Sequence, residues 1–188
     1  MAGGNSLEGR EQKKGIAINT LYTMGGLLFM NAVLQLVITP LLNRMMGAEQ
    51  LGSLLYITGL VAIICPSIGQ ALNNSRLVVR RDFDVTNGDY DWLLLGFGLI
   101  GSIVALFMSG KSLESPLMAV GVFLMFMLTV FRYYGDVEYR LNLNYRRYFI
   151  YYLLIGIGYL AGFGIYRLTG QWVWIYLIGE AAALAFVG

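Results

Sequence analysis

Four polar side chains recur at every fourth position of an otherwise apolar stretch, NAVLQLVITPLLNR: Asn31, Gln35, Thr39 and Asn43. In an α-helix a step of four residues advances about 400°, or roughly 40° net, so these side chains form one slowly drifting stripe. Amides and hydroxyls do hydrogen-bonding chemistry. The stripe either lines a hydrated cavity that a polar cargo crosses or hydrogen-bonds neighbouring helices, and both uses occur among membrane helices.

A second polar face follows in CPSIGQALNNSR, where Ser67, Gln70, Asn73 and Asn74 are spaced by three and four residues. Pro66 interrupts the hydrogen-bond ladder of any helix there, and broken polar helices often flank transport paths. We therefore assign Gln70 to the same path as Asn31, Gln35 and Thr39. The two asparagines are expected at the membrane interface.

Glu180 is the residue that most directly indicates ionic chemistry. It lies eight positions after Trp172 in an apolar run, or about 12 Å along a helix, which is near the middle of a bilayer. A carboxylate there costs roughly 2.5–3.5 kcal/mol on insertion scales. Glu180 is expected either to bind a proton or a cation for energy coupling, or to form a structural hydrogen bond.

Several kinds of chemistry are excluded by residue type. The chain has no histidine and one cysteine, Cys65, so His-based catalysis, Ser-His triads and nearly all zinc sites are ruled out. The acidic segment Asp82–Asp91 lacks the glycine register and closing glutamate of a calcium loop. No cluster of nucleophile, base and oxyanion donors is present. We expect no enzyme activity, no cofactor and no metal.

Composition places these residues in a membrane. Of 188 residues, 57% are hydrophobic and 13% are charged, against about a quarter charged in soluble domains; the mean hydropathy is +0.65. The net charge of +2 gives no indication of a nucleic-acid partner. The sequence therefore predicts an all-α membrane protein.

Six apolar segments are long enough, or nearly so, for membrane helices of about 17–25 residues. After a disordered tail at residues 1–15, we expect a six-helix lobe over 16–188, with a kink at Pro40 and a fourth helix extended by its flanks. The predicted helices span residues 16–42, 51–72, 92–108, 116–131, 148–166 and 172–188.

Basic residues predict the orientation, because they collect on the cytoplasmic side. Alternate loops separate them into a large and a small group. The large group is Arg10, Lys13, Lys14, Arg76, Arg80, Arg81, Arg132, Arg140, Arg146 and Arg147, and the small group is Arg44, Lys111 and Arg167. The N-terminus is therefore expected in the cytoplasm, and the chain in the inner cell membrane.

Two hairpins carry a family resemblance. TPLLNRMMGAEQLGSLLY joins the first two helices, and VEYRLNLNYRRYFIYYLL joins the fourth and fifth. Both resemble the polysaccharide-biosynthesis flippases of the multidrug/oligosaccharidyl-lipid/polysaccharide exporter superfamily. Leu51 stands where that family commonly has an aromatic residue. The motif positions here are Arg44, Gly47, Glu49, Gly52, Glu138 and Arg140.

The resemblance implies two six-helix lobes around a central cavity that opens alternately to each side. It implies a cargo of lipid-linked oligosaccharide, of the undecaprenyl-diphosphate type, with glycosyltransferases or a polymerase as further partners. The chain matches one such lobe, so we expect a C-terminal half to be missing from it. By the same resemblance, Arg76 and Arg132 are the cations that first meet the diphosphate at the cytoplasmic mouth.

Two other functions stay open. A cation-coupled drug antiporter of the same superfamily would use a membrane acid such as Glu180. A non-transporting membrane scaffold for polysaccharide assembly would need only the helices.

Overall fold

The computed structural model describes residues 4–82, 87–113, 115–141 and 143–187 of the chain, in some places by the backbone alone. The described residues are helical and include no strand. The elements are α1 (Gly4–Ala32), η1 (Val33–Ile38), α2 (Thr39–Met45), α3 (Ala48–Asp82), α4 (Asn87–Ser109), η2 (Gly110–Ser112), α5 (Pro116–Leu141), α6 (Tyr145–Thr169) and α7 (Val173–Val187).

The prediction of an all-α membrane protein with six helices is confirmed. Five helical segments are long and apolar enough to cross a membrane, and a shorter apolar helix covers Val173–Phe186. The five are Ile18–Met45, Ala48–Arg76, Gly88–Ser109, Pro116–Val137 and Tyr145–Thr169. The first comprises the second half of α1 together with η1 and α2. The fourth is longer than the apolar run alone predicted, because α5 continues through Arg132 to Leu141.

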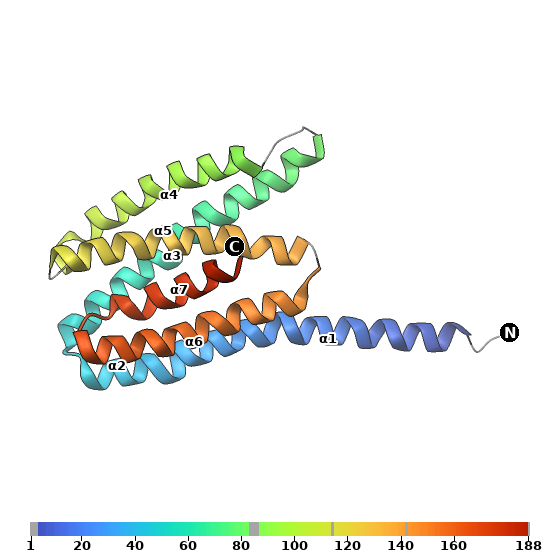
Figure 1. The fold of residues 1–188 in the computed structure, drawn as a ribbon, viewed down its shortest axis with the longest axis horizontal. Helices are drawn as coiled ribbons and strands as arrows, with labels where there is room; N and C mark the ends of the chain where they lie inside the picture. Colours follow the sequence, from blue (N-terminus) through green and yellow to red (C-terminus); the bar gives the residue numbers. More distant parts are fainter. Residues whose placement is uncertain (1–3, 83–86, 114, 142, 188) are drawn as a thin grey trace.

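The helix boundaries differ from the predicted ones mainly at the polar ends. Helix α1 begins at Gly4, although residues 1–15 were expected to be disordered. The segment Leu7–Lys14 consists mainly of glutamate, glutamine, arginine and lysine, which are good helix formers. In Figure 1 this part of α1 projects beyond the other helices.

The helices pack in two groups of three. Helix α6 packs against α1 and α7, whereas α3, α4 and α5 pack against one another. The two groups meet where α5 packs against α7. Figure 1 shows α6 lying along α1 on one side of the molecule and α4 on the opposite side, with α5 and α7 between them. Helices α1 and α3 belong to different groups, and the cleft described below lies between them.

Glycines allow the closest helix approaches. A Cβ atom added at Gly158 of α6 would lie 2.7 Å from the Cα of Gly179 in α7. One added at Gly69 of α3 would lie 2.7 Å from the Cβ of Tyr133 in α5. Small residues are common at membrane helix interfaces because they let backbones approach. At Gly158 the backbones of α6 and α7 therefore approach closely.

Candidate functional site: a polar cleft between α1 and α3

A cleft of about 420 Å³ is lined by α1, η1 and α2 on one side and α3 on the other, with α5, α6 and α7 completing it. This volume falls in the range of about 300–1,000 Å³ that is usual for small-molecule sites. The cleft lies within the membrane-spanning segments. Its polar and aromatic lining comprises Asn31, Gln35, Thr39, Thr58, Thr129, Arg132, Tyr133, Tyr159, Tyr176 and Glu180.

A wide turn in the first membrane segment aims the predicted stripe into this cleft. Residues Val33–Ile38 form a π-helix, in which each N–H bonds five residues back. The Thr39 N–H and the Thr39 hydroxyl both donate to the carbonyl of Leu34, the hydroxyl at 2.8 Å. Pro40 has no N–H, so the widened turn stands where an ordinary ladder would be interrupted. π-turns of this kind occur frequently at functional sites.

The π-turn divides the stripe. Asn31, Gln35 and Thr39 line the cleft, whereas Asn43 is exposed and lies outside it. The extra residue in the wide turn changes which side chains share a face, so the four-residue spacing no longer describes one straight line. The expected kink at Pro40 takes this form, a π-turn just before the proline.

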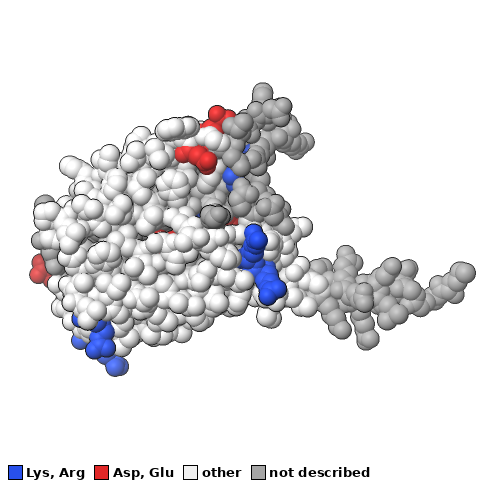
Figure 2. All heavy atoms as spheres, in the orientation of Figure 1, with Lys and Arg blue, Asp and Glu red and all other residues white. Residues whose placement is uncertain are grey.

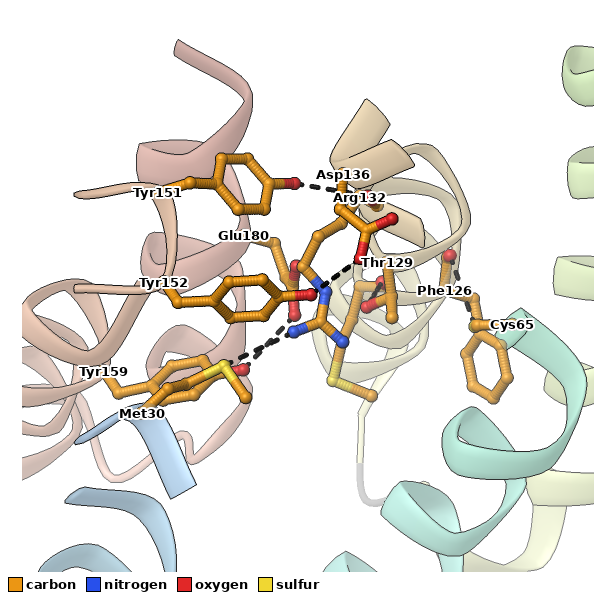
Figure 3. Close-up of polar contacts among 11 residues, drawn as sticks. Met30, Cys65, Phe126, Thr129, Arg132, Asp136, Tyr151, Tyr152, Tyr159 and Glu180 are labelled. Atoms are coloured by element: carbon orange, nitrogen blue, oxygen red, sulfur yellow. Dashed lines mark hydrogen bonds and ion pairs between the residues drawn. The ribbon is translucent and has the colours of Figure 1, made fainter. Parts of the chain in front are cut away.

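An ion pair lies against the cleft. The Nε of Arg132 on α5 is 3.0 Å from Oε2 of Glu180 on α7, and both residues are buried. The direction of that N–H falls outside hydrogen-bond geometry, so the interaction is a charge contact. Tyr159 of α6 donates its hydroxyl to the other carboxylate oxygen, Oε1, at 3.3 Å. Figure 3 shows these three side chains converging from α5, α7 and α6.

The rest of the Arg132 guanidinium is also engaged. Its central carbon lies 4.6 Å from the centroid of the Tyr133 ring, which is a cation–π distance. Its Nη1 donates to the Met30 sulfur of α1 at 3.6 Å. Arg132 contacts residues of α1, α5 and α7. It therefore connects the two helix groups at the wall of the cleft.

Two further tyrosines of α6, Tyr151 and Tyr152, make hydrogen bonds to α5 near this pair. Tyr152 donates its hydroxyl to Oδ2 of Asp136 at 2.8 Å, and Tyr151 donates to the backbone carbonyl of Arg132 at 3.2 Å (Figure 3). All three of these tyrosine and aspartate side chains are buried. The network holds the middle of α5 in a fixed relation to α6.

Arg132 was expected as a cation at the cytoplasmic mouth. It lies towards the end of the apolar segment Pro116–Val137, and its partner is Glu180. The expectation that Arg132 stands at the end of its helix came from ending the apolar run at the first charge. The helix continues because Glu180 neutralises that charge in place. Several roles were considered for Glu180. In the structure it pairs with the cation Arg132.

Arg76, the other cation expected at the mouth, is the last residue of the apolar segment Ala48–Arg76, and its side chain is buried. It is 2% exposed, and its Nη1 and Nη2 donate to the Tyr134 hydroxyl at 3.1 Å and to Oδ1 of Asn73 at 3.3 Å. Asn73 in turn donates to the carbonyls of Tyr133 and Tyr134. Asn73 was expected at the membrane interface, but it is buried because α5 supplies these acceptors. Asn74 is exposed.

Gln70 is not brought to the cleft with the other path residues. It is exposed on α3 and does not belong to the cleft lining. Helix α3 continues through Pro66 without a break. Ser67 beside it donates its hydroxyl to the carbonyl of Ile63 at 2.6 Å.

The positions of the first hairpin on which the resemblance rests are exposed around the turn between α2 and α3. Arg44 is in the last turn of α2 and Glu49 in the first turn of α3, where each charge complements the helix dipole. Cβ atoms added at Gly47 or Gly52 would meet nothing within 4 Å. For Glu138 and Arg140, which lie in α5, the side chains are outside the described part.

The sequence reasoning missed Thr58, Thr129 and Asp136. Thr58 and Thr129 line the cleft, and Asp136 is buried beside Tyr152. A signal for two of them was present, because Thr129, Arg132 and Asp136 are spaced by three and four residues and share one face of α5.

Comparison of the chain with family models, curated proteins and solved structures finds no match.

Proposed function

We propose that the chain forms one lobe of a membrane flippase that moves lipid-linked oligosaccharide across the cytoplasmic membrane by alternating access. The observation that carries this proposal is the polar cleft within membrane-spanning helices. Sugars and phosphates cannot cross hydrocarbon without groups that replace their water. The amides of Asn31 and Gln35 and the hydroxyls of Thr39 and Thr58 line such a path, while the lipid tail of the cargo stays in the bilayer.

The outer surface supports a function inside the bilayer. Large apolar side chains are exposed along α4, among them Trp92, Phe97, Ile100, Ile103 and Phe107. On the face seen in Figure 2, charged side chains gather towards the ends of the helices, and the broad middle is nearly free of them. In this proposal lipid tails cover that middle zone, and the N-terminus faces the cytoplasm, as the distribution of arginine and lysine favours.

A cation-coupled drug antiporter is the second candidate, and the observation that favours it is Glu180. A buried carboxylate beside a cleft is the usual site of proton or sodium coupling in membrane carriers. The two candidates differ in cargo. Drug efflux restored by the gene, without oligosaccharide movement, would favour the antiporter. Crosslinking to a glycosyltransferase, with neither cargo moved, would favour a scaffold.

The proposal is tested in vesicles. The product of the complete gene is reconstituted with a fluorescent lipid-linked oligosaccharide, and a membrane-impermeant quencher reports how fast the headgroup changes leaflet. We expect movement faster than in empty vesicles and a loss of at least tenfold with Gln35→Leu. Gln70→Leu is the matched control, because Gln70 is an exposed glutamine outside the cleft. Movement equal to that in empty vesicles, or unaffected by Gln35→Leu, would contradict the proposal.

A further inference from the structure

We propose that this cleft binds the neutral sugar part of the headgroup, through the hydrogens of sugar hydroxyls, and does not bind the phosphate part. This inference rests on the proposed function and deepens it. Two features of the described residues carry it: the direction of the hydrogen bonds that the lining side chains already make, and the charge balance of Arg132 with Glu180.

The threonines of the lining have already committed their hydroxyl hydrogens. Thr39 donates its only hydroxyl hydrogen to the carbonyl of Leu34, and Thr58 donates its own to the carbonyls of Leu54 and Leu55. The Asn31 amide nitrogen donates to the carbonyl of Leu27 at 2.9 Å. What remains on the two threonines is lone pairs on oxygen, whereas Asn31 keeps its carbonyl oxygen and its second amide hydrogen. A ligand that contacts the threonines must therefore bring hydrogen-bond donors.

A sugar brings such donors and a phosphate does not. Each sugar hydroxyl donates one hydrogen and accepts through two lone pairs, so it matches both the threonine oxygens and the Gln35 amide. Gln35 is exposed in the cleft wall and has no hydrogen-bond partner among the described residues. An ionised phosphate ester offers acceptor oxygens alone, which would face the acceptor oxygens of Thr39 and Thr58.

The charge of the cleft does not favour an anion. Arg132 and Glu180 are the charged members of its described lining, and they lie 3.0 Å apart. A phosphate that approached Arg132 would meet the Glu180 carboxylate beside it, and the repulsion between the two anions would offset the attraction of the arginine. The same balance removes net attraction for a cation, since Arg132 neutralises Glu180. A neutral polyhydroxylated group can bind without disturbing either charge.

The test compares three small probes with the same four-carbon tail: butyl β-glucoside, butyl phosphate and butylammonium. The product of the complete gene is placed in nanodiscs, and its unfolding temperature is measured against the concentration of each probe, which yields an affinity. We expect the glucoside to bind and the other two to bind at least tenfold more weakly. Tighter binding of the phosphate or of the ammonium would overturn the inference, and the ammonium result would favour the antiporter.

Two pairs of variants locate the binding. Thr58→Val keeps the shape of the side chain and removes the oxygen, and Gln35→Leu removes the amide. Each is expected to weaken the glucoside about fivefold, the usual effect of one hydrogen bond. Ser67→Ala and Gln70→Leu lie on α3 outside the cleft and should leave the affinity unchanged. Equal affinities in all four variants would overturn the inference.

The two proposals fail in different ways. If the oligosaccharide crosses vesicles but the glucoside does not bind preferentially, the sugar inference is wrong and the flippase proposal stands. If the glucoside binds in the cleft but nothing crosses, the cleft is a sugar site in a protein that does not transport, and the flippase proposal is wrong.

Discussion

Two buried arginines sit over adjacent tyrosines of α5, and they do different things. Arg132 lies 4.6 Å from the Tyr133 ring and Arg76 lies 4.5 Å from the Tyr134 ring. Arg132 is paired with the carboxylate of Glu180 and belongs to the lining of the cleft. Arg76 lies outside that lining, where Asn73 and the Tyr134 hydroxyl accept from it.

The two residues are of the same type, so their different roles come from their positions and partners. Arg132 belongs to the cleft, whereas Arg76 makes packing contacts outside it. Neighbouring tyrosines of a helix point in different directions, so each arginine meets a different set of helices. Each cluster also adjoins a close approach made possible by glycine. Gly179 directly precedes Glu180 and meets Gly158, whereas Gly69 lies one turn before Asn73 and meets Tyr133.

The largest expected effect comes from removing the acid of the pair at the cleft. Glu180→Leu leaves the Arg132 guanidinium buried without its counter-charge. Loss of one partner of a buried pair costs about 3–5 kcal/mol. We expect Glu180→Leu to lower the unfolding temperature in detergent more than any other substitution discussed here, as measured by near-ultraviolet circular dichroism.

The double variant Arg132→Met/Glu180→Leu is the control for charge. It removes both charges, so most of the lost stability should return, because a buried pair replaced by apolar residues is often neutral or better. The stability of Glu180→Gln should lie between those of Glu180→Leu and the double variant, because the glutamine amide oxygen can still accept a hydrogen bond from Tyr159. If the double variant is as unstable as Glu180→Leu, the pair contributes through packing rather than charge.

The second prediction compares the two glycine approaches. Gly158→Ala places a methyl group 2.7 Å from a backbone Cα, and Gly69→Ala places one 2.7 Å from the Tyr133 Cβ and 2.9 Å from the Val130 carbonyl oxygen. Such overpacking costs about 1–3 kcal/mol. Both variants should unfold earlier, and Gly158→Ala should also reduce oligosaccharide movement because it displaces the helix that carries Glu180. Equal transport defects would mean that the two regions are coupled.

Sequence reasoning predicted those parts of the molecule that depend on local pattern. The helices follow from hydropathy, and the Asn31–Gln35–Thr39 stripe follows from spacing. It did not reveal the buried partners of Arg132, Arg76 and Asn73, because those partners come largely from other helices. An arginine in an apolar run marks the end of a helix when it has no partner, but it can lie inside the membrane when an acidic residue of another helix pairs with it. The positions of Arg132 and Glu180 in the sequence do not reveal that their side chains lie close together.

The third prediction concerns the neutral partner of Arg76. Asn73→Leu removes two hydrogen bonds to α5 carbonyls and one acceptor for the arginine. The two hydrogen bonds to α5 contribute about 0.5–1.5 kcal/mol each, so we expect their loss to lower the free energy of unfolding by about 1–3 kcal/mol. Unlike Gln35→Leu, this variant should bind butyl β-glucoside with wild-type affinity. A tenfold loss of glucoside affinity would erase the distinction between the two regions.

The smallest effect is expected at Gly52, and it should have the opposite sign. This position lies in α3, and a Cβ there would meet nothing within 4 Å. Alanine at a helical glycine with open space stabilises by about 0.4–1 kcal/mol, because it restricts the unfolded chain. Gly52→Ala therefore serves as the baseline for Gly69→Ala and Gly158→Ala, measured by the same unfolding assay. If Gly52→Ala destabilises the chain as strongly as they do, that glycine meets a neighbour outside the described residues, and the open surface around the first hairpin is a contact face.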